Sequence, residues 1–466
     1  MGRIIGAYIF PHPPIIVPEV GKGEEKDAGK TIDAAIKVSE EIKNKKPTTI
    51  IVTTPHAPAF EDYMRISDDK VLKGSFKRFG RPDVKLSFDN NLSLVQSIVS
   101  HAAEEGIQAG GVDGATASKY GLSSELDWGA LVPLYYITKE YKDFKVVHIS
   151  ISYLSLEELY RFGMSIGKAV EASDENVVFI ASGDLSHKLS HDGPYGYSEE
   201  GKRFDQLIVN SIRENNVDAL LNIDDDFCER AGQCGLRSFI IMYGALDGYR
   251  LKPEVYSYEA PFGVGYCIAK IDTDIEDSDR KVLDKRMEEI RKNEDEYVRL
   301  ARKSLETYVR EGRIIEVPDD VPKEMRENRA GVFVSIKKDG QLRGCIGTIS
   351  PTRENIAEEI IYNTISSGTG DPRFFPVEER ELPSLVYSVD VLMKPEPINS
   401  IEELDVIKYG VIVRSGRSSG LLLPNLEGIN TPEEQVEIAL RKAGIGKNEK
   451  YSLERFEVIR HEPYKR

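Results

Sequence analysis

Short apolar runs that end in small polar residues and a histidine occur three times in the first half of the chain. The runs are rich in Val and Ile, which is typical of buried strands. They are residues 4–10 before His12, residues 49–54 before His56, and residues 178–182 before His187. Because ligands of open α/β sheets bind at the carboxyl ends of parallel strands, we expect the three imidazoles to lie near one another.

Between these strands the apolar residues recur at the helical period. Residues 27–45 place Ile32, Ala35 and Ile42 on one face, which predicts a strand–helix–strand unit with parallel strands. The same reasoning predicts further helices at 92–105, 127–134, 156–172, 195–215 and 233–246, and further strands at 145–151 and 256–271. Residues 60–90 are charged and show no clear period, so we expect an irregular excursion or lid there.

The pattern changes at Asp272, where a densely charged stretch begins. We therefore expect a first domain at 1–272, a charged linker at 273–294 and a second domain at 295–466. In the second domain, alternation predicts strands at 332–336 and 385–391 and a hairpin at 409–424, and helical spacing predicts helices at 353–366 and 432–443. The first domain should be α/β with a mostly parallel sheet flanked by helices, and the second α+β with an antiparallel sheet.

Composition narrows the function classes. The chain has 466 residues and a formal net charge of −16, which argues against a general nucleic-acid or anionic-membrane binder. No apolar run reaches the roughly 18 residues of a membrane span, and the N-terminus enters a strand without a leader pattern. We therefore expect a cytoplasmic protein. Its four cysteines form no CxxC pair, which favours reduced thiols over a disulfide framework.

The histidines are the main candidates for chemistry. A single histidine after a strand is more often a structural hydrogen-bonding residue than a ligand. Three at equivalent strand ends reverse those odds, because two imidazoles that converge on one point form the usual start of a metal site. A carboxylate or a thiolate commonly completes such a site.

Four motifs in residues 1–272 resemble the class III extradiol dioxygenases, the LigB-like fold that also includes the Memo proteins. They are Pro11-His12-Pro13-Pro14, Thr54-Pro55-His56-Ala57, Ser182-Gly183-Asp184-Leu185-Ser186-His187, and Cys234-Gly235 before a helix. The resemblance implies that His12, His56 and a glutamate hold non-haem Fe(II), and that His187 acts as acid and base beside a bound catechol.

The sequence does not identify the third metal ligand. In the Memo branch a cysteine stands where Cys234 stands, whereas Glu229 is close in sequence and Glu259 is a more remote carboxylate. In an equally good interpretation, Cys234 is a small buried residue, as free cysteines more often are. A thiolate ligand would favour Zn or Cu as alternatives to Fe.

The pocket around the metal should include Asp184, His191 and Tyr195, which flank His187 in sequence. The sequence also departs from the dioxygenase pattern at Trp128, which stands where those enzymes often carry a histidine. Because an indole has one N–H donor and cannot shuttle a proton, this residue puts ordinary catechol cleavage in doubt. We expect His148 to be structural or superficial.

Residues 295–466 resemble the AMMECR family through Leu342-Arg343-Gly344-Cys345-Ile346-Gly347-Thr348, supported by Asp371-Pro372-Arg373-Phe374 and Ser419-Gly420-Leu421-Leu422-Leu423-Pro424. In one interpretation Gly344 and Gly347 let the backbone approach a ligand, while Arg343 grips a carboxylate or phosphate. In the other, the motif is a tight turn in which Cys345 simply packs. The sequence favours neither, because no general base is evident beside the thiol.

Both halves together resemble the fused AmmeMemoRadiSam system protein A family, which implies a radical SAM protein as partner. Our leading hypothesis is a metal-dependent oxidoreductase that uses Fe(II) and O2 on a catechol-like or other hydroxylated aromatic substrate. The alternative is a Memo-like metal-binding or modification module that takes a small-molecule or peptide substrate. A scaffold with vestigial histidines is a third reading, and a homo-oligomer is compatible with all three.

Overall fold

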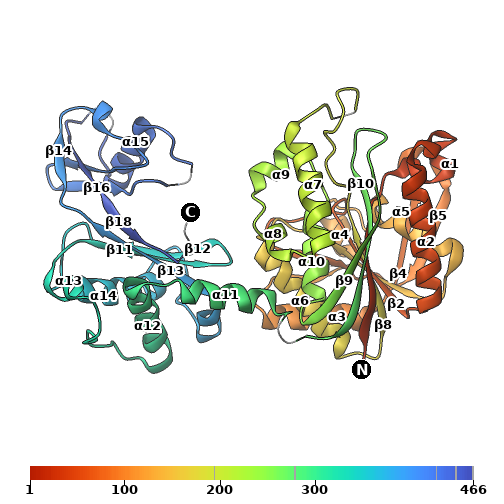
Figure 1. The fold of residues 1–466 in the computed structure, drawn as a ribbon, viewed down its shortest axis with the longest axis horizontal. Coiled ribbons are helices and arrows are strands. Elements are labelled where there is room, and N and C mark those ends of the chain that lie inside the picture. The colour runs from red at the N-terminus through yellow and green to blue at the C-terminus, as the bar shows by residue number, and fades with distance from the viewer. Residues whose placement is uncertain (194, 278–279, 427, 447–448, 464–466) are drawn as a thin grey trace. The chain divides into compact units, whose positions relative to one another are not determined.

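The computed structural model describes residues 1–193, 195–277, 280–426, 428–446 and 449–463 (Figure 1). Its chain divides into two compact units, Met1–Leu283 and Asp284–Arg466. The segment 273–294 carries the end of a strand, which runs to Glu276, and the helix α11 (Val282–Lys292). Each unit is described by itself below.

The first unit is built on an eight-stranded sheet with the order β6-β3-β7-β2-β8-β1-β10-β9. The pairs β1–β8, β2–β8, β2–β7 and β3–β6 are parallel, and the remaining pairs are antiparallel. This mostly parallel sheet confirms the predicted fold class. Its strands are β1 (Arg3–Phe10), β2 (Thr49–Thr54), β3 (Met64–Ser67), β6 (Ala109–Val112), β7 (Lys145–Ser150), β8 (Asn176–Ser182), β9 (Tyr249–Glu259) and β10 (Tyr266–Glu276).

Helices cover both faces of this sheet (Figure 1). One core contains apolar residues of α3 (Leu92–Glu104), α6 (Leu156–Glu171), α7 (Glu199–Glu214) and α10 (Leu236–Ala245). The other contains residues of α2 (Gly29–Lys45) and α5 (Trp128–Glu140). The shorter helices are α1 (Pro18–Gly21), α4 (Gly114–Lys119), α8 (Val217–Leu221) and α9 (Asp225–Ala231). Because helices cover both faces of the sheet, the central strands are buried, and their sequences are therefore continuous apolar runs.

The three strands that precede the predicted histidines are neighbours. β8 lies between β1 and β2, and Ala181 of β8 pairs with Ile9 of β1 and with Thr53 of β2. The three strands therefore end at the same level of the sheet. His12, His56 and His187 follow these ends, as the sequence pattern predicted.

Three sequence predictions in this unit are wrong. The single strand expected at 256–271 is a pair of antiparallel strands, β9 and β10, in which Tyr266 pairs with Glu259. Residues 60–90 are not irregular, because they form β3, a two-stranded ribbon of β4 (Val71–Phe76) and β5 (Arg81–Asp89), and a 3₁₀ turn at Lys77–Phe79. The helix expected from residue 195 begins only at Glu199, after Leu189 and Tyr197 have formed an isolated bridge.

The second unit has two four-stranded sheets, with the orders β12-β11-β13-β18 and β14-β17-β15-β16. All pairs are antiparallel, which confirms the predicted α+β class. The strands are β11 (Val332–Lys338), β12 (Gln341–Gly347), β13 (Leu385–Leu392), β14 (Glu396–Ile398), β15 (Gly410–Ser415), β16 (Ser418–Leu422), β17 (Ser452–Phe456) and β18 (Val458–His461). The helices are α12 (Glu296–Glu311), α13 (Lys323–Glu327), α14 (Ile356–Thr369) and α15 (Pro432–Ala443).

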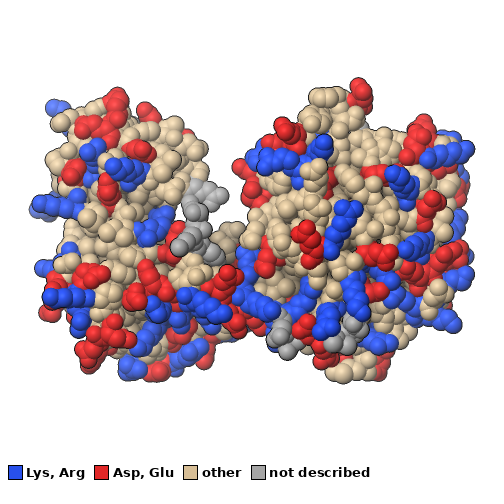
Figure 2. All heavy atoms as spheres, viewed as in Figure 1, with Lys and Arg blue, Asp and Glu red and all other residues tan. Residues whose placement is uncertain are grey.

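The surface carries both signs of charge. On the face shown in Figure 2, Lys and Arg side chains are interspersed with Asp and Glu. In the described part of the chain, no helix combines the length and the apolar character that crossing a membrane requires.

Candidate metal centre

The rings of His12 and His56 meet at the carboxyl end of the sheet. Their Nε2 atoms are 2.8 Å apart, and the ring planes are nearly perpendicular. His12 is 1% exposed and His56 is half-buried. Burial lowers the pKa of each imidazole to about 3. Both rings are therefore neutral near pH 7, which is the form that binds metals.

Hydrogen bonds determine which nitrogen of His12 faces the site. The Ser182 hydroxyl donates its only proton to the backbone carbonyl of Gly129 at 2.5 Å, so its oxygen must accept from Nδ1–H of His12, 2.8 Å away. Nε2 of His12 then carries the lone pair and points at His56. This is the tautomer of a metal-ligating histidine whose other nitrogen is held by a hydrogen bond.

The thiol of Cys234 completes the cluster. It lies 3.6 Å from Nε2 of His12, just before α10, and the backbone N–H of Asp184 donates to Sγ at 3.3 Å. One potential ligand atom from each of His12, His56 and Cys234 lies within 4.8 Å of the others. Burial raises the pKa of the thiol well above its usual value. A cation at this position would counter that effect, because a coordinating thiol is deprotonated.

These three groups fit a small metal ion. Ions such as Zn²⁺ bind histidine nitrogen at about 2.0–2.1 Å and thiolate sulfur at about 2.3 Å, so a tetrahedral angle spans roughly 3.5 Å between N and S. The observed sulfur to Nε2 separation is 3.6 Å. The two Nε2 atoms, at 2.8 Å, match a smaller angle at the metal. Three ligands leave further coordination positions open, as in catalytic sites.

His187 stands on the other side of the thiol. Its Nε2 is 3.7 Å from Sγ of Cys234, and burial lowers the pKa of its imidazole. Asp184 is buried and accepts a hydrogen bond from the backbone N–H of His12 at 2.8 Å. Burial raises the pKa of this carboxyl to about 6. Asp184, His187 and Cys234 thus form a second group of potential ligands that shares the thiol with the first.

Aromatic rings lie against His56 and His187. Trp128 stacks on His56 with ring centroids 4.1 Å apart and planes at 22°. The indole also lies against the ring of Phe79 and the guanidinium of Arg78, which is 4.7 Å from the ring centroid. Tyr195 is mostly exposed, yet its ring centroid lies 5.0 Å from that of His187. The segment predicted as a lid therefore covers the indole with its 3₁₀ turn.

Three of the predicted residues lie apart from the two ligand groups. Glu229 lines a cavity of about 380 Å³ that also reaches Pro55 and Cys234, and its backbone carbonyl accepts from Nζ of Lys188. Glu259 instead accepts hydrogen bonds from the backbone and hydroxyl of Thr31. His191 is exposed, and its ring lies against Tyr197. Among the described residues, Cys234 belongs to a group of potential ligands with His12 and His56, and neither glutamate does.

Sequence reasoning did not predict that Asp127 pairs with His148. Asp127 caps α5 by accepting from the backbone N–H of Gly129 at 2.8 Å, and it also accepts from the hydroxyl of Thr54 at 2.6 Å. His148 is 1% exposed and pairs with the other carboxylate oxygen at 3.0 Å. An Asp immediately before an apolar helix is a recognisable capping signal. No local sequence pattern indicates that this carboxylate pairs with a histidine on β7.

The AMMECR-like motif lies on a strand and does not form the tight turn of the second interpretation. Residues 342–347 lie in β12, where Arg343 forms a two-pronged ion pair with Glu381, both bonds 2.9 Å long. A Cβ at Gly344 would overlap the backbone of Ser367, and one at Gly347 the ring of Phe333. The glycines therefore allow close packing within the unit, and the guanidinium already binds a carboxylate of its own chain.

Cys345 is half-buried on the same strand. The hydroxyl of Ser335 donates to its sulfur at 3.3 Å, and its backbone N–H donates to Asp371 at 2.9 Å. A bidentate ion pair with Arg373 holds the pKa of that carboxyl well below its usual range. Hydrogen bonds from Ser335 and to Asp371 thus hold Cys345 within the second unit.

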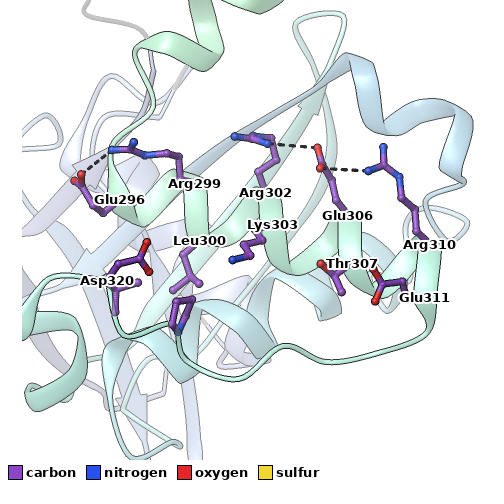
Figure 3. A pocket seen from close by; sticks show the side chains of 12 residues that line it. Glu296, Arg299, Leu300, Arg302, Lys303, Glu306, Thr307, Arg310, Glu311 and Asp320 are labelled. Carbon is purple, nitrogen blue, oxygen red and sulfur yellow. Dashed lines mark hydrogen bonds and ion pairs between the residues drawn. The ribbon is translucent and has the colours of Figure 1, made fainter.

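A separate cavity of about 400 Å³ runs along α12 and residues 318–321 (Figure 3). Arg299 pairs with Glu296, and Arg302 and Arg310 both pair with Glu306. Since these cations are matched by carboxylates of the same wall, this lining is typical of a surface ion-pair network.

Comparison with known proteins matches both units. Residues 6–269 match the family described as the catalytic LigB subunit of aromatic ring-opening dioxygenase, and residues 298–461 match the AMMECR1 family. The protein CA_C1420 of Clostridium acetobutylicum is 49% identical over 98% of each chain. A Thermotoga maritima protein is 50% identical over 35% of this chain and 96% of its own. The crystal structure of the uncharacterized protein PH0010 from Pyrococcus horikoshii, 34% identical, covers 36% of this chain and 90% of its own with a TM-score of 0.34.

Proposed function

Because the chain belongs to the family of the catalytic LigB subunit of aromatic ring-opening dioxygenases, with an AMMECR1 domain after it, we propose that it is a metal-dependent oxidoreductase. His12, His56 and Cys234 would hold the metal ion, with Fe(II) as the first candidate. The substrate would be a catechol-like or other hydroxylated aromatic molecule. When bound, Fe(II) would supply the redox chemistry with O2.

One observation carries this proposal. Two neutral imidazoles, of which His12 is buried and His56 half-buried, bring their Nε2 atoms to 2.8 Å of each other, and a thiol lies 3.6 Å from Nε2 of His12. Burying polar side chains with lone pairs aimed at each other costs free energy unless a proton or a cation lies between them. A proton on Nε2 of His56 would satisfy only the two imidazoles, whereas a metal ion would satisfy both imidazoles and the thiol at once.

The surrounding residues have roles of their own in this proposal. His187 would take a proton from a substrate hydroxyl and later return it, since burial lowers the pKa of its imidazole and keeps it a neutral base. Asp184 fixes the backbone of His12. Trp128 covers one face of His56 and excludes water from it.

The test is anaerobic loading with Fe(II), followed by oxygen uptake with a panel of catechols. We expect stoichiometric iron binding and substrate-dependent oxygen uptake, which His187→Gln should abolish while leaving iron binding intact. A protein that binds no Fe(II), or binds it and takes up no oxygen with any of the catechols, would contradict the dioxygenase proposal.

A second candidate is favoured by the thiol itself. A thiolate in place of a carboxylate suits Zn or Cu as well as Fe. The chain would then be a metal-binding or modification module that works with a radical SAM partner protein. Tight binding of Zn²⁺ or Cu⁺ without oxygen uptake, together with co-purification of an iron–sulfur protein from the native host, would support it. Oxygen uptake with the catechol panel would contradict it.

A further inference from the structure

Residues at the start of α5 contact the two side chains that hydrogen-bond to the histidine ligands, Thr54 for His56 and Ser182 for His12. Asp127 accepts from the hydroxyl of Thr54 at 2.6 Å, and the same oxygen of Thr54 accepts from the backbone N–H of His56 at 3.3 Å. Trp128 stacks on the ring of His56. Asp127 and Trp128 thus contact His56 or its partner Thr54, and the next residue, Gly129, contacts the partner of His12.

The carbonyl of Gly129 reaches His12 through one side chain. It accepts from Ser182, whose oxygen accepts from Nδ1–H of His12. A Cβ at Gly129 would overlap Thr54, so the close approach requires glycine. A shift of residues 127–129 would therefore move Thr54 and Ser182, the hydrogen-bond partners of His56 and His12, together.

The segment is itself anchored by a buried charge. The side chain of Asp127 is 7% exposed, and its second carboxylate oxygen pairs with Nε2 of His148, whose Nδ1 is 2.8 Å from the hydroxyl of Ser67. Burial alone would raise the pKa of Asp127, but the hydrogen bonds from His148 and Thr54 lower it to about 2. The guanidinium of Arg65 is 1% exposed and lies close enough for its charge to interact with Asp127.

Arg65 also interacts electrostatically with Asp69. Its closest hydrogen bonds, to Ser150 and to the carbonyl of Ser123, are both 3.3 Å, and its Nε is buried without a partner among the described residues. An arginine held this loosely in the interior is explained better by charge compensation than by local hydrogen bonding. Its charge interacts with the carboxylates of both Asp127 and Asp69.

We propose that residues 127–129 form a brace that sets the spacing of the two histidine ligands, with Asp127 as its positioning residue and His148 as its anchor. This inference rests on the proposed metal site. It extends that site to two strands that carry none of the ligands, because His148 lies on β7 and its partner Ser67 lies on β3. Outer partners of metal ligands typically change affinity by about 10–100-fold when they are replaced.

The experiment compares metal affinity in the full-length chain, with Co(II) absorbance titrations and Zn²⁺ competition. Asp127→Ser keeps a helix cap but cannot reach Thr54 and His148 together, and Asp127→Asn keeps the shape and removes the charge. The matched control is Asp113→Ser, which replaces the capping aspartate of α4. Emission of Trp128, the only tryptophan in the chain, reports on the brace directly.

We expect Asp127→Ser to lose about 10–100-fold in affinity and Asp127→Asn to lose less, each with a shifted Trp128 emission in the metal-free protein. Asp113→Ser should match the wild type in both readouts. Wild-type affinity and emission in both Asp127 variants would overturn the brace while leaving the metal site intact. Absence of Co(II) and Zn²⁺ binding in the wild type would instead refute the metal site on which the inference rests. If Asp127→Ser fails to fold, the isosteric Asp127→Asn decides the outcome.

Discussion

At the residue scale, two half-buried cysteines offer a controlled comparison. Cys228 and Cys234 both line the cavity beside the metal centre, and burial raises the pKa of the Cys228 thiol to about 12. Only Cys234 belongs to a group of potential ligands among the described residues. The site therefore predicts opposite behaviour for two chemically identical substitutions.

Cys234→Ser should weaken Co(II) binding at least as much as the roughly 10–100-fold typical of losing an outer partner, because it removes a direct ligand. It should also remove the thiolate-to-cobalt absorption band. Cys228→Ser should keep both the affinity and the band. A band that survives in Cys234→Ser would show that this sulfur does not bind the metal.

Asp205 gives a pH-dependent prediction that does not involve the metal. It accepts hydrogen bonds from the backbone of Ser186 and the hydroxyl of Tyr258, and burial raises the pKa of its carboxyl to about 7. In the unfolded chain the pKa is about 3.9. Between these values the native state holds a proton that the unfolded state has lost, so this group's contribution to stability falls as pH rises.

The expected slope is at most about 1.4 kcal/mol per pH unit between pH 4 and 7. Urea unfolding at pH 5 and pH 7 should show the free energy of unfolding of the wild type falling relative to Asp205→Asn. A difference between the two proteins that stays constant with pH would contradict the raised pKa.

At the element scale, the position of Cys234 depends on how closely α10 packs on α6. A Cβ at Gly244 would overlap the backbone carbonyl of Tyr160, and one at Gly163 would overlap that of Ile241. These glycines let the two helices approach with their backbones nearly in contact. Cys234 stands two residues before α10, so the helix packing determines where its sulfur lies.

Gly244→Ala should lower the free energy of unfolding by about 1–3 kcal/mol or more, because the added methyl group must separate the helices. Gly29→Ala is the control: nothing lies within 4 Å of its added Cβ, and its φ of −58° suits alanine. It should instead stabilise the protein by about 0.4–1 kcal/mol. Urea unfolding measures both, and equal effects would contradict the packing described here.

The elements also show why the sequence predicts some of the fold and not the rest. Strands buried on both faces gave clear apolar runs, and histidines just after them could be expected at one sheet edge. In β5, by contrast, Val84, Leu86 and Phe88 alternate with charged and polar residues, but the charge density of the segment hid this pattern. The pairing of Asp127 with His148 joins a helix cap to a strand, a tertiary contact that no local periodicity encodes.

At the scale of the whole molecule, the two units have separate apolar cores. The candidate metal ligands and Trp128 all belong to the first unit. A ligand that binds only the native form of one unit stabilises that unit by mass action, by about 2.7 kcal/mol at a hundredfold excess over Kd. The second unit should not respond.

Thermal unfolding of the full chain should therefore show a metal-dependent transition in Trp128 emission. Calorimetry should resolve a further transition whose midpoint does not change when metal is added. If one cooperative transition moves as a whole, the two units are energetically coupled and this prediction is wrong.

The most direct measurement is an anomalous-scattering map of crystals grown with the metal, recorded on both sides of its absorption edge. We predict one strong peak within bonding distance of Nε2 of His12, Nε2 of His56 and Sγ of Cys234, at about 2.0–2.3 Å. A peak held by carboxylates elsewhere, or no peak between these three atoms in metal-loaded crystals, would contradict the proposed metal centre.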